Sequence, residues 1–311
     1  MPANVTDAVL AQWGLEGAVE LSDAICGGSP NRVLSRTAFQ KDGEVYVLEA
    51  LPSEKAAARL RQASFLNALS KNGCGRLNPW LPTISGLYGT SYDGMFWQLR
   101  RYASGSHELP DEYSGESWRG VALADFLLEM RRKSSRMDGG EPFLLSEYIP
   151  RALHAIGHRN AALREDLLPI VAELAAFLEK EAELPMSFCH GDFHPQNVIW
   201  GDGCINAVID WEFCGVKTAM YDVANLLGCI GMDCPENFSG GLATAFIREL
   251  RKADSFPRES WRWLPECMAA TRIAWMREWC FMDNRELMVQ ELDFIWLLLD
   301  NRDALRRKFD S

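Results

Sequence analysis

Residues 190–197 read His-Gly-Asp-Phe-His-Pro-Gln-Asn, and they constrain the fold of this chain more than any other segment. They place Asp192 five positions before Asn197, and Asp210 follows thirteen residues later behind an apolar run. Gly-Asp-Gly at 201–203 is turn chemistry between two apolar stretches, so it predicts a hairpin. We therefore expect Asn197 and Asp210 near the open end of one hairpin, where two ligands could share a cation.

This pattern of side chains meets the needs of phosphoryl transfer from a nucleotide. One carboxylate orients the attacking hydroxyl, while an amide oxygen and a second carboxylate hold the metal. Mg²⁺ prefers oxygen ligands and usually takes only one or two from the protein. We predict Asp192 as the catalytic base, Asn197 and Asp210 as metal ligands, and Mg²⁺ and ATP as cofactor and co-substrate. An ordinary polar turn with Asp210 as a cap is the alternative, which the register of all three residues disfavours.

The same segment, together with Val-Ile-Asp-Trp-Glu at 208–212 and Tyr-Asp-Val-Ala-Asn at 221–225, resembles the aminoglycoside phosphotransferase and choline kinase family. The resemblance is strongest over residues 186–228. It implies a protein-kinase-like fold, with Asp192 as the base and Asn197 and Asp210 binding magnesium. It also implies that Glu212 supports the metal and that Asp222 is structural, bonding backbone at a helix start.

The predicted fold class is α+β with two lobes. Two hairpins, at 32–51 around Lys-Asp-Gly and at 84–101 around Tyr-Asp-Gly, surround a helix at 53–71. They predict a small antiparallel-sheet, nucleotide-binding lobe over residues 1–102, preceded by a short helix at 5–13. Residues 103–311 form a larger, mostly helical, catalytic and substrate-binding lobe, in which 163–178 shows a clear helical period.

Composition agrees with a soluble globular protein and narrows its partners. The 311 residues are 48% hydrophobic and 24% charged, with no apolar run long enough to span a bilayer. A net charge of −11 argues against nucleic acid as a partner. The first residues lack the pattern of a signal peptide, and nine scattered cysteines read as reduced core residues, so we expect a cytoplasmic protein.

Two features of the first hundred residues concern the nucleotide. Gly27, Gly28, Ser29 and Asn31 lie in a candidate phosphate loop, because adjacent glycines let backbone approach phosphates closely. An ordinary turn is the competing interpretation of this loop.

The second feature is Glu49, which stands on the strand where the family usually has a basic residue. The helix position of the usual acidic partner is also changed, with Gln62 as the candidate. Pairing of Glu49 with Lys55, Arg59 or Arg61 would relieve its repulsion of phosphates, with one of these or Arg32 supplying positive charge. A Glu49 side chain turned away from the nucleotide would have the same effect, and some sugar kinases of the superfamily that the chain resembles also lack the lysine. Loss of nucleotide binding in a pseudokinase is the remaining explanation.

The acceptor end of the site is less determined by sequence. Trp275 and Trp279 lie four residues apart on one helix face, and either form an aromatic box for an ammonium group or pack in the core. Acidic residues such as Glu212, Glu278 and Asp283 could receive an amine instead. His194 is expected to stabilise its loop, and His190 to bond backbone near the metal aspartate without ligating the metal.

The sequence therefore predicts a kinase of a small hydroxylated molecule, such as choline, ethanolamine, an amino sugar, homoserine or an aminoglycoside. A pseudokinase that binds a metabolite or partner is the alternative from another class. Protein kinase activity is disfavoured because no Ala-Pro-Glu segment follows Asp210. The choice of ATP or GTP and the formation of a homodimer stay open.

Overall fold

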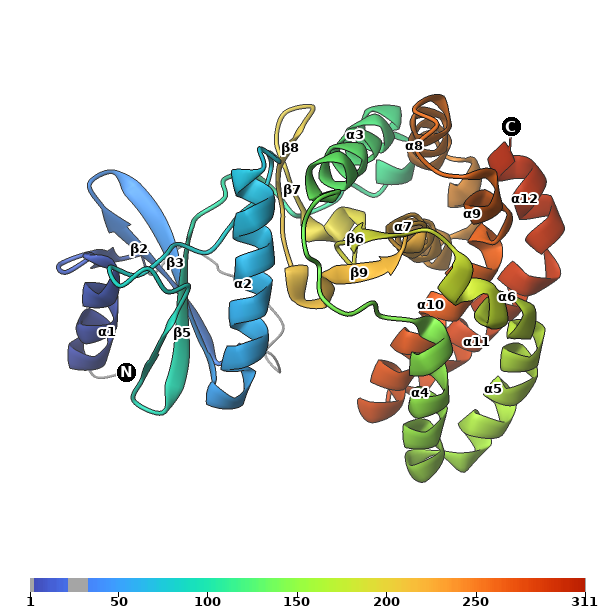
Figure 1. Cartoon of the computed structure of the whole chain (residues 1–311), viewed down its shortest axis with the longest axis horizontal. Helices are drawn as coiled ribbons and strands as arrows, with labels where there is room; N and C mark the ends of the chain where they lie inside the picture. The colour runs from blue at the N-terminus through green and yellow to red at the C-terminus, as the bar shows by residue number, and fades with distance from the viewer. Residues whose placement is uncertain (1–2, 22–32, 311) are drawn as a thin grey trace. The chain divides into compact units, whose positions relative to one another are not determined.

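The computed structural model describes residues 3–21 and 33–310, and the chain divides into two compact units (Figure 1). The first unit contains the chain up to Ser106 and two later segments, residues 198–201 and 205–212. The second unit contains residues 107–197, 202–204 and 213–311. The predicted α+β class is confirmed, since an antiparallel sheet dominates the first unit and helices dominate the second. The boundary predicted between residues 102 and 103 stays a prediction.

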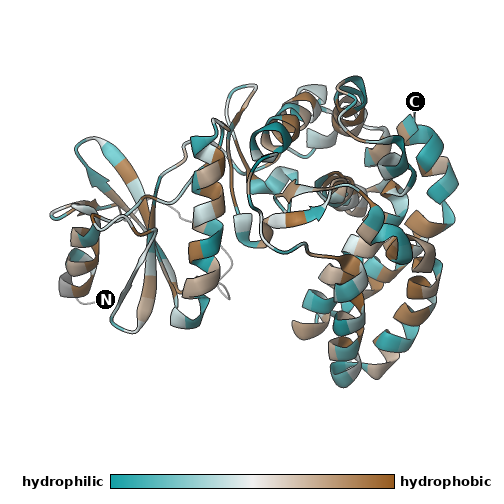
Figure 2. Ribbon diagram, in the orientation of Figure 1, coloured by the Kyte–Doolittle hydropathy of each residue, from teal (hydrophilic) through white to brown (hydrophobic). Residues whose placement is uncertain are grey.

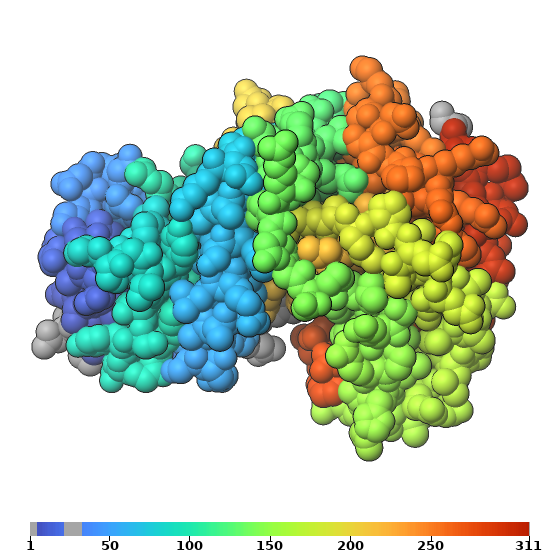
Figure 3. All heavy atoms as spheres, in the orientation of Figure 1, coloured from blue at the N-terminus to red at the C-terminus, as the bar shows by residue number. Residues whose placement is uncertain are grey.

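The first unit is built around a five-stranded antiparallel sheet in the order β1-β2-β3-β5-β4. Helix α1 covers one face of the sheet and α2 the other (Figure 1), and α2 presents its outer side in the space-filling view (Figure 3). The elements are α1 (Ala3–Leu10), β1 (Val19–Glu20), β2 (Ser35–Lys41), β3 (Glu44–Pro52), α2 (Ala56–Lys71), β4 (Thr90–Tyr92), β5 (Met95–Arg101), β7 (Val198–Trp200) and β8 (Ile205–Val208).

Alternation along the strands decides which side chains each helix covers. Leu48 and Ala50 of β3 join Leu99 of β5 in an apolar core against Val9 and Leu10 of α1. Side chains one position away along each strand point to the other face of the sheet. Glu49 therefore faces the side of α2, where the exposed fraction of the residue is 1%.

Both predicted Asp-Gly hairpins of the sheet are present. Asp42 and Gly43 have φ of 52° and 82°, and Asp93 and Gly94 have φ of 50° and 73°. Two successive positive φ values give the turn twist that antiparallel strands need. The strand predicted to begin at residue 84 was wrong in extent, because β4 begins only at Thr90.

The hairpin β7–β8 belongs to the first unit although it lies far along the sequence. The Val208 N–H donates to the carbonyl of Arg76 at 2.8 Å, and the Trp200 N–H donates to that of Ser106 at 2.7 Å. Asp210 lies two residues beyond the end of β8. This predicted hairpin is confirmed, with its turn at residues 201–204.

The second unit is mostly helical and holds a two-stranded antiparallel sheet of β6 and β9. Helix α10 packs against α4, α7 and α11, and α3 packs against α8. Its elements are α3 (Ser117–Ser134), α4 (Leu145–Arg159), α5 (Ala161–Glu173), α6 (Ala175–Lys180), β6 (Met186–Cys189), β9 (Gly215–Thr218), α7 (Tyr221–Asp233), α8 (Gly241–Lys252), α9 (Arg258–Arg262), α10 (Leu264–Phe281), α11 (Arg285–Asp300) and α12 (Arg302–Asp310).

The helical period predicted over residues 163–178 is confirmed, since α5 and α6 cover this range except for Leu174, where one helix gives way to the next. Both helices carry hydrophobic and hydrophilic residues (Figure 2). In the described ranges, no helix is both long and apolar enough to cross a bilayer.

Candidate functional site

The segment 190–197 lies in the second unit, where β6 delivers it to the start of α7. The Asp222 carboxylate accepts the N–H of His190 at 2.7 Å and of Gly191 at 2.8 Å. Gly191 has φ of 87°, and a Cβ atom there would collide with the carbonyl of Phe213. Asp222, in the first turn of α7, therefore holds the motif loop through its backbone. The structural role predicted for Asp222, a bond to backbone from a helix start, is confirmed.

Asp192 sits at the centre of a set of hydrogen bonds. Asn197 Nδ2 donates to the Asp192 backbone carbonyl at 2.8 Å and to its Oδ2 at 3.0 Å. Asn225 Nδ2 lies 3.4 Å from Oδ1, and His194 Nε2 lies 3.5 Å from the same oxygen. The predicted base and the predicted ligand Asn197 are thus brought together.

These neighbours also set the charge of Asp192, which is 4% exposed. Burial by itself would raise the pKa of Asp192. Hydrogen bonds from His194 and Asn197 and the positive potential of His194 and His190 outweigh burial, so the pKa lies below its usual value. Asp192 is therefore a carboxylate at neutral pH.

Asn225 is a site residue that the sequence analysis did not identify. It also donates to the carbonyl of Phe193 at 3.3 Å. A signal was present, because Asn225 lies three residues after Asp222 and residues at this spacing share one helix face. His190 Nδ1 accepts from the backbone N–H of Asp192 at 3.2 Å, so this contact with the backbone lies within the motif itself.

The two predicted metal ligands belong to different units, Asn197 to the second and Asp210 to the first. Both Asn197 bonds to Asp192 use Nδ2, so its Oδ1 is left to accept or to ligate. Asp210 has φ of 59°, in the left-handed region that aspartate enters more readily than most residues. An amide oxygen and a carboxylate are a donor set that fits Mg²⁺.

Glu212 lies beside Asp210 in the first unit, and its side chain is half-buried. Its backbone carbonyl accepts from Gln62 Nε2 at 2.8 Å. Gln62 thus ties α2 to the segment after β8. The predicted phosphate-loop residues Gly27, Gly28, Ser29 and Asn31 lie outside the described residues.

Glu49 has partners other than those expected. Arg36 Nε and Arg100 Nη2 each lie 2.7 Å from Glu49 Oε1. Burial favours a higher pKa, but the positive charges of Arg100, Arg36 and Arg59 outweigh it, so the pKa of Glu49 is lowered. The expectation of pairing with Lys55, Arg59 or Arg61 was therefore incomplete: Arg59 contributes, while strand neighbours make the direct contacts.

Trp275 and Trp279 lie on α10 in the second unit, stacked with ring centroids 5.9 Å apart. Trp279 Nε1 donates to Glu291 Oε1 at 3.1 Å, and Arg272 Nε donates to the other oxygen of Glu291 at 2.8 Å. Glu291 is 1% exposed, but both indoles are only half-buried. Glu291 thus fixes Trp279, and part of each indole stays exposed to solvent.

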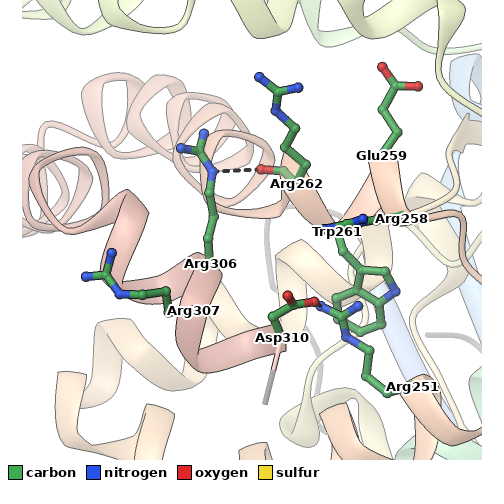
Figure 4. Close-up of a pocket in the computed structure, with 8 residues that line it drawn as sticks. All are labelled: Arg251, Arg258, Glu259, Trp261, Arg262, Arg306, Arg307 and Asp310. Atoms are coloured by element: carbon green, nitrogen blue, oxygen red, sulfur yellow. Dashed lines mark hydrogen bonds and ion pairs between the residues drawn. The ribbon is translucent and has the colours of Figure 1, made fainter.

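A cavity of about 490 Å³ also lies in the second unit, and five arginines line it against two carboxylates (Figure 4). Arg251 pairs with Asp310 at 3.0 Å, and Arg306 donates to the carbonyl of Arg262 at 2.9 Å. Within the described part of the chain, Arg258 and Arg307 make no ion pair. The cavity is positively charged, and its lining includes none of the predicted site residues.

Residues 30–269 match the sequence profile of the phosphotransferase enzyme family. No curated protein sequence matches the chain.

Among solved structures, a microcompartment-associated aminopropanol kinase is similar with a TM-score of 0.69 and 14% identity, covering 97% of this chain and 98% of its own. An aminoglycoside phosphotransferase from Alicyclobacillus acidocaldarius has a TM-score of 0.65 and 15% identity, with 97% and 94% covered. The amicoumacin kinase hAmiN, solved with AMP-PNP, Ca²⁺ and Ami, has a TM-score of 0.62 and 15% identity. The likeness covers 93% of this chain and 90% of that one. These likenesses confirm the predicted two-lobed, kinase-like fold.

Proposed function

Because the chain belongs to the phosphotransferase enzyme family, we propose that it moves the γ-phosphate of ATP to a hydroxyl of a small molecule that carries an amino or ammonium group. The observation that carries the proposal is the buried Asp192 carboxylate, held between Asn197 and Asn225 and ionised at neutral pH. It is poised to accept a hydrogen bond from an attacking hydroxyl.

Asp192 acts mainly by orientation. A carboxylate with a lowered pKa is a weak base, so it holds the hydroxyl in line and receives the proton late in the transfer. This suits phosphoryl transfer, whose loose transition state needs positioning more than proton removal. Asn197 and Asn225 fix the carboxylate in this role through their amide donors.

Asn197 and Asp210 are the residues that would hold Mg²⁺. When bound, the ion neutralises charge on the nucleotide phosphates. The Asn197 side chain then has two tasks, because its Nδ2 holds Asp192 while its Oδ1 is left for the metal. This shared use would couple metal binding to the orientation of the base.

The proposed acceptor class includes choline, ethanolamine, aminopropanol, amino sugars, homoserine and aminoglycosides. Support comes from the similar folds, which include an aminopropanol kinase and aminoglycoside phosphotransferases. The partly exposed indoles of Trp275 and Trp279 would attract an ammonium group by cation–π interaction, and the Glu212 carboxylate would attract it by charge.

Melting temperature with ATP or GTP, each with and without Mg²⁺, tests nucleotide binding, since a ligand of the native state raises it by mass action. Nucleotide consumption is then measured with each acceptor. A Mg²⁺-dependent shift followed by acceptor-dependent consumption is expected. No shift in melting temperature with either nucleotide at millimolar concentration would instead favour the pseudokinase. The observation behind this alternative is Glu49, which stands on β3 where the family usually has a basic residue.

The acceptor assignment has its own test in Trp275→Ala. Loss of a cation–π contact is expected to raise the acceptor KM roughly tenfold with little change in kcat. The matched control is Phe281→Ala, because Phe281 is an exposed aromatic residue on the same helix. Equal KM values for native and Trp275→Ala would assign the stack to packing.

A further inference from the structure

An ionic cluster of Glu49, Arg36 and Arg100 lies on the sheet face of the first unit that α2 covers, and Arg59 of α2 adds its charge to this cluster. Arg36 is opposite Glu49 in the β2–β3 register, and Gln98 is opposite it in the β3–β5 register. Directly paired residues share one face of a sheet, and so do residues two apart on a strand. Arg100 therefore reaches Glu49 diagonally from β5.

Each guanidinium in this cluster spends only part of its donor set on Glu49. Arg36 uses Nε and Arg100 uses Nη2, and both bonds go to the same oxygen, Oε1. A guanidinium has five N–H donors in a fixed plane. Within the described residues Glu49 is the one ion-pair partner of Arg100. Because that bond fixes the plane of the guanidinium, it also fixes the direction in which the other N–H groups of Arg100 point.

Arg59 adds a further positive charge from α2. It is 7% exposed, its charge lowers the pKa of Glu49, and it makes no direct ion pair with a described residue. Glu49 can neutralise at most one guanidinium, so Arg59 and Arg100 together leave a surplus of positive charge. A desolvated surplus of this kind is stabilised when an anion accepts charge-assisted hydrogen bonds.

This surplus of positive charge surrounds Glu49, the residue whose negative charge would oppose phosphate binding. A bare carboxylate at the centre of β3 would repel a nucleotide triphosphate. Here two guanidinium groups cover one of its oxygens, and the carboxylate holds them in place. We propose that Glu49 is a positioning residue and that Arg100 and Arg59, which it holds or faces, form the phosphate-binding subsite that a strand lysine forms elsewhere.

The inference rests on the proposed function, because it names the groups that bind the phosphates of that nucleotide. On this proposal, Glu49 does not mark the loss of a phosphate-binding cation, because it holds the arginines that bind the phosphates. Pre-positioned guanidiniums lose little side-chain entropy on binding, and their planar forks suit phosphate oxygens. The subsite therefore recognises the triphosphate and not the nucleoside.

The decisive variant is Arg100→Gln, with Arg101→Gln as its matched control. Arg101 is the next residue on β5, points to the other face, pairs with Glu44, and its side chain is 58% exposed. Dissociation constants for Mg²⁺-ATP and for adenosine are measured by calorimetry on the full chain, and the melting temperature of each variant checks its fold.

Arg100→Gln is expected to weaken ATP roughly tenfold or more, as loss of a charge-assisted hydrogen bond does, and to leave adenosine unchanged. Arg101→Gln should change neither. Unchanged ATP affinity in Arg100→Gln, or equal losses for ATP and adenosine, would overturn the subsite, because a purely structural role would affect both ligands alike.

Glu49→Lys separates the anchor from a defective lysine. If Glu49 is an anchor, a lysine among three arginines disrupts the cluster, and ATP affinity falls. If Glu49 merely replaces a binding lysine, the substitution restores it, and ATP binds more tightly than to the native protein. Tighter binding would contradict the proposal, and the Arg100→Gln comparison still applies if Glu49→Lys fails to fold.

Inorganic triphosphate distinguishes failure of this inference from failure of the proposed function. It is tested in an Arg258→Gln/Arg307→Gln background, which removes two exposed arginines of the cavity in Figure 4. Triphosphate binding that depends on Arg100, without nucleotide consumption, would keep the subsite and reject the kinase. Nucleotide consumption together with an ATP affinity that does not depend on Arg100 would keep the kinase and reject the subsite. If neither ATP nor triphosphate binds, the subsite and the kinase are both rejected.

Discussion

Glu49 and Asp192 are two buried carboxylates, one in each unit, and they are kept ionised by different neighbours. Glu49 is surrounded by arginines, two of them at 2.7 Å. Asp192 accepts from the amides of Asn197 and Asn225 and lies 3.5 Å from His194. Both have a lowered pKa despite burial.

The difference suits two tasks. Full positive charges around Glu49 bind its carboxylate tightly and leave cationic donors directed away from it. Around Asp192, two imidazoles and the Asn197 amide stabilise the charge, while the carboxylate stays able to accept a further hydrogen bond. A carboxylate can therefore serve as an anchor among guanidinium groups or as an acceptor among imidazole and amide groups.

The largest expected effect is on turnover by Asp192→Asn. Loss of the acceptor carboxylate should lower kcat on the order of 10³-fold, whereas melting temperature and ATP affinity stay close to native. Acceptor-dependent nucleotide consumption measures it, with the exposed turn residue Asp202→Asn as control. Native-like turnover in Asp192→Asn would remove Asp192 from the role of base.

The free energy of unfolding should fall further when Glu49 is neutralised than when an acidic residue at the surface is neutralised. Glu49→Gln leaves partly buried arginines without their counter-ion, so the free energy of unfolding should fall by about 3 kcal/mol. Glu44→Gln, which breaks the exposed pair with Arg101, should cost about 0.5 kcal/mol. Urea denaturation measures both, and equal losses would show that the cluster adds no stability.

The acid limb of stability should reveal the lowered pKa values. A carboxyl with a lower pKa in the folded state stabilises fully above its unfolded pKa, about 4, and loses this contribution as pH falls through the folded value. Unfolding free energy should decline below about pH 4, and Glu49→Gln should make the decline shallower. Burial raises the pKa of Asp222, so its contribution runs in the opposite direction.

A steeper decline in Glu49→Gln than in the native protein would contradict the sign of this linkage. The exposed Glu44→Gln provides the baseline for charge removal at the surface.

The smallest effect is expected from Asn225→Ala, whose bond to Asp192 is long at 3.4 Å. About 1 kcal/mol of lost orientation should lower kcat roughly fivefold and move the acid limb of the kcat profile to higher pH. The shift distinguishes it from a merely structural change, and a lower kcat with an unmoved profile would argue against contact with the base.

Local turn and motif chemistry was predictable. The Asp-Gly turns formed because Asp42, Gly43, Asp93 and Gly94 all adopt positive φ, which their short or absent side chains allow. The split of residues 163–178 was not predictable from period alone, since the apolar face continues across Leu174. Nor was β4, because residues 84–89 are apolar enough to resemble a strand without pairing as one.

By itself the sequence determined the kinase-like fold, the placement of Asp192 and Asn197 on one short loop, and the anomaly at Glu49. Only the tertiary structure decided how that anomaly is resolved. Arg36 and Arg100 lie 13 and 51 residues from Glu49 in sequence, and strand register brings them to one carboxylate. Hydrogen-bond register acts across the sheet, so the pairing of these charges cannot be read from residues that are neighbours along the chain.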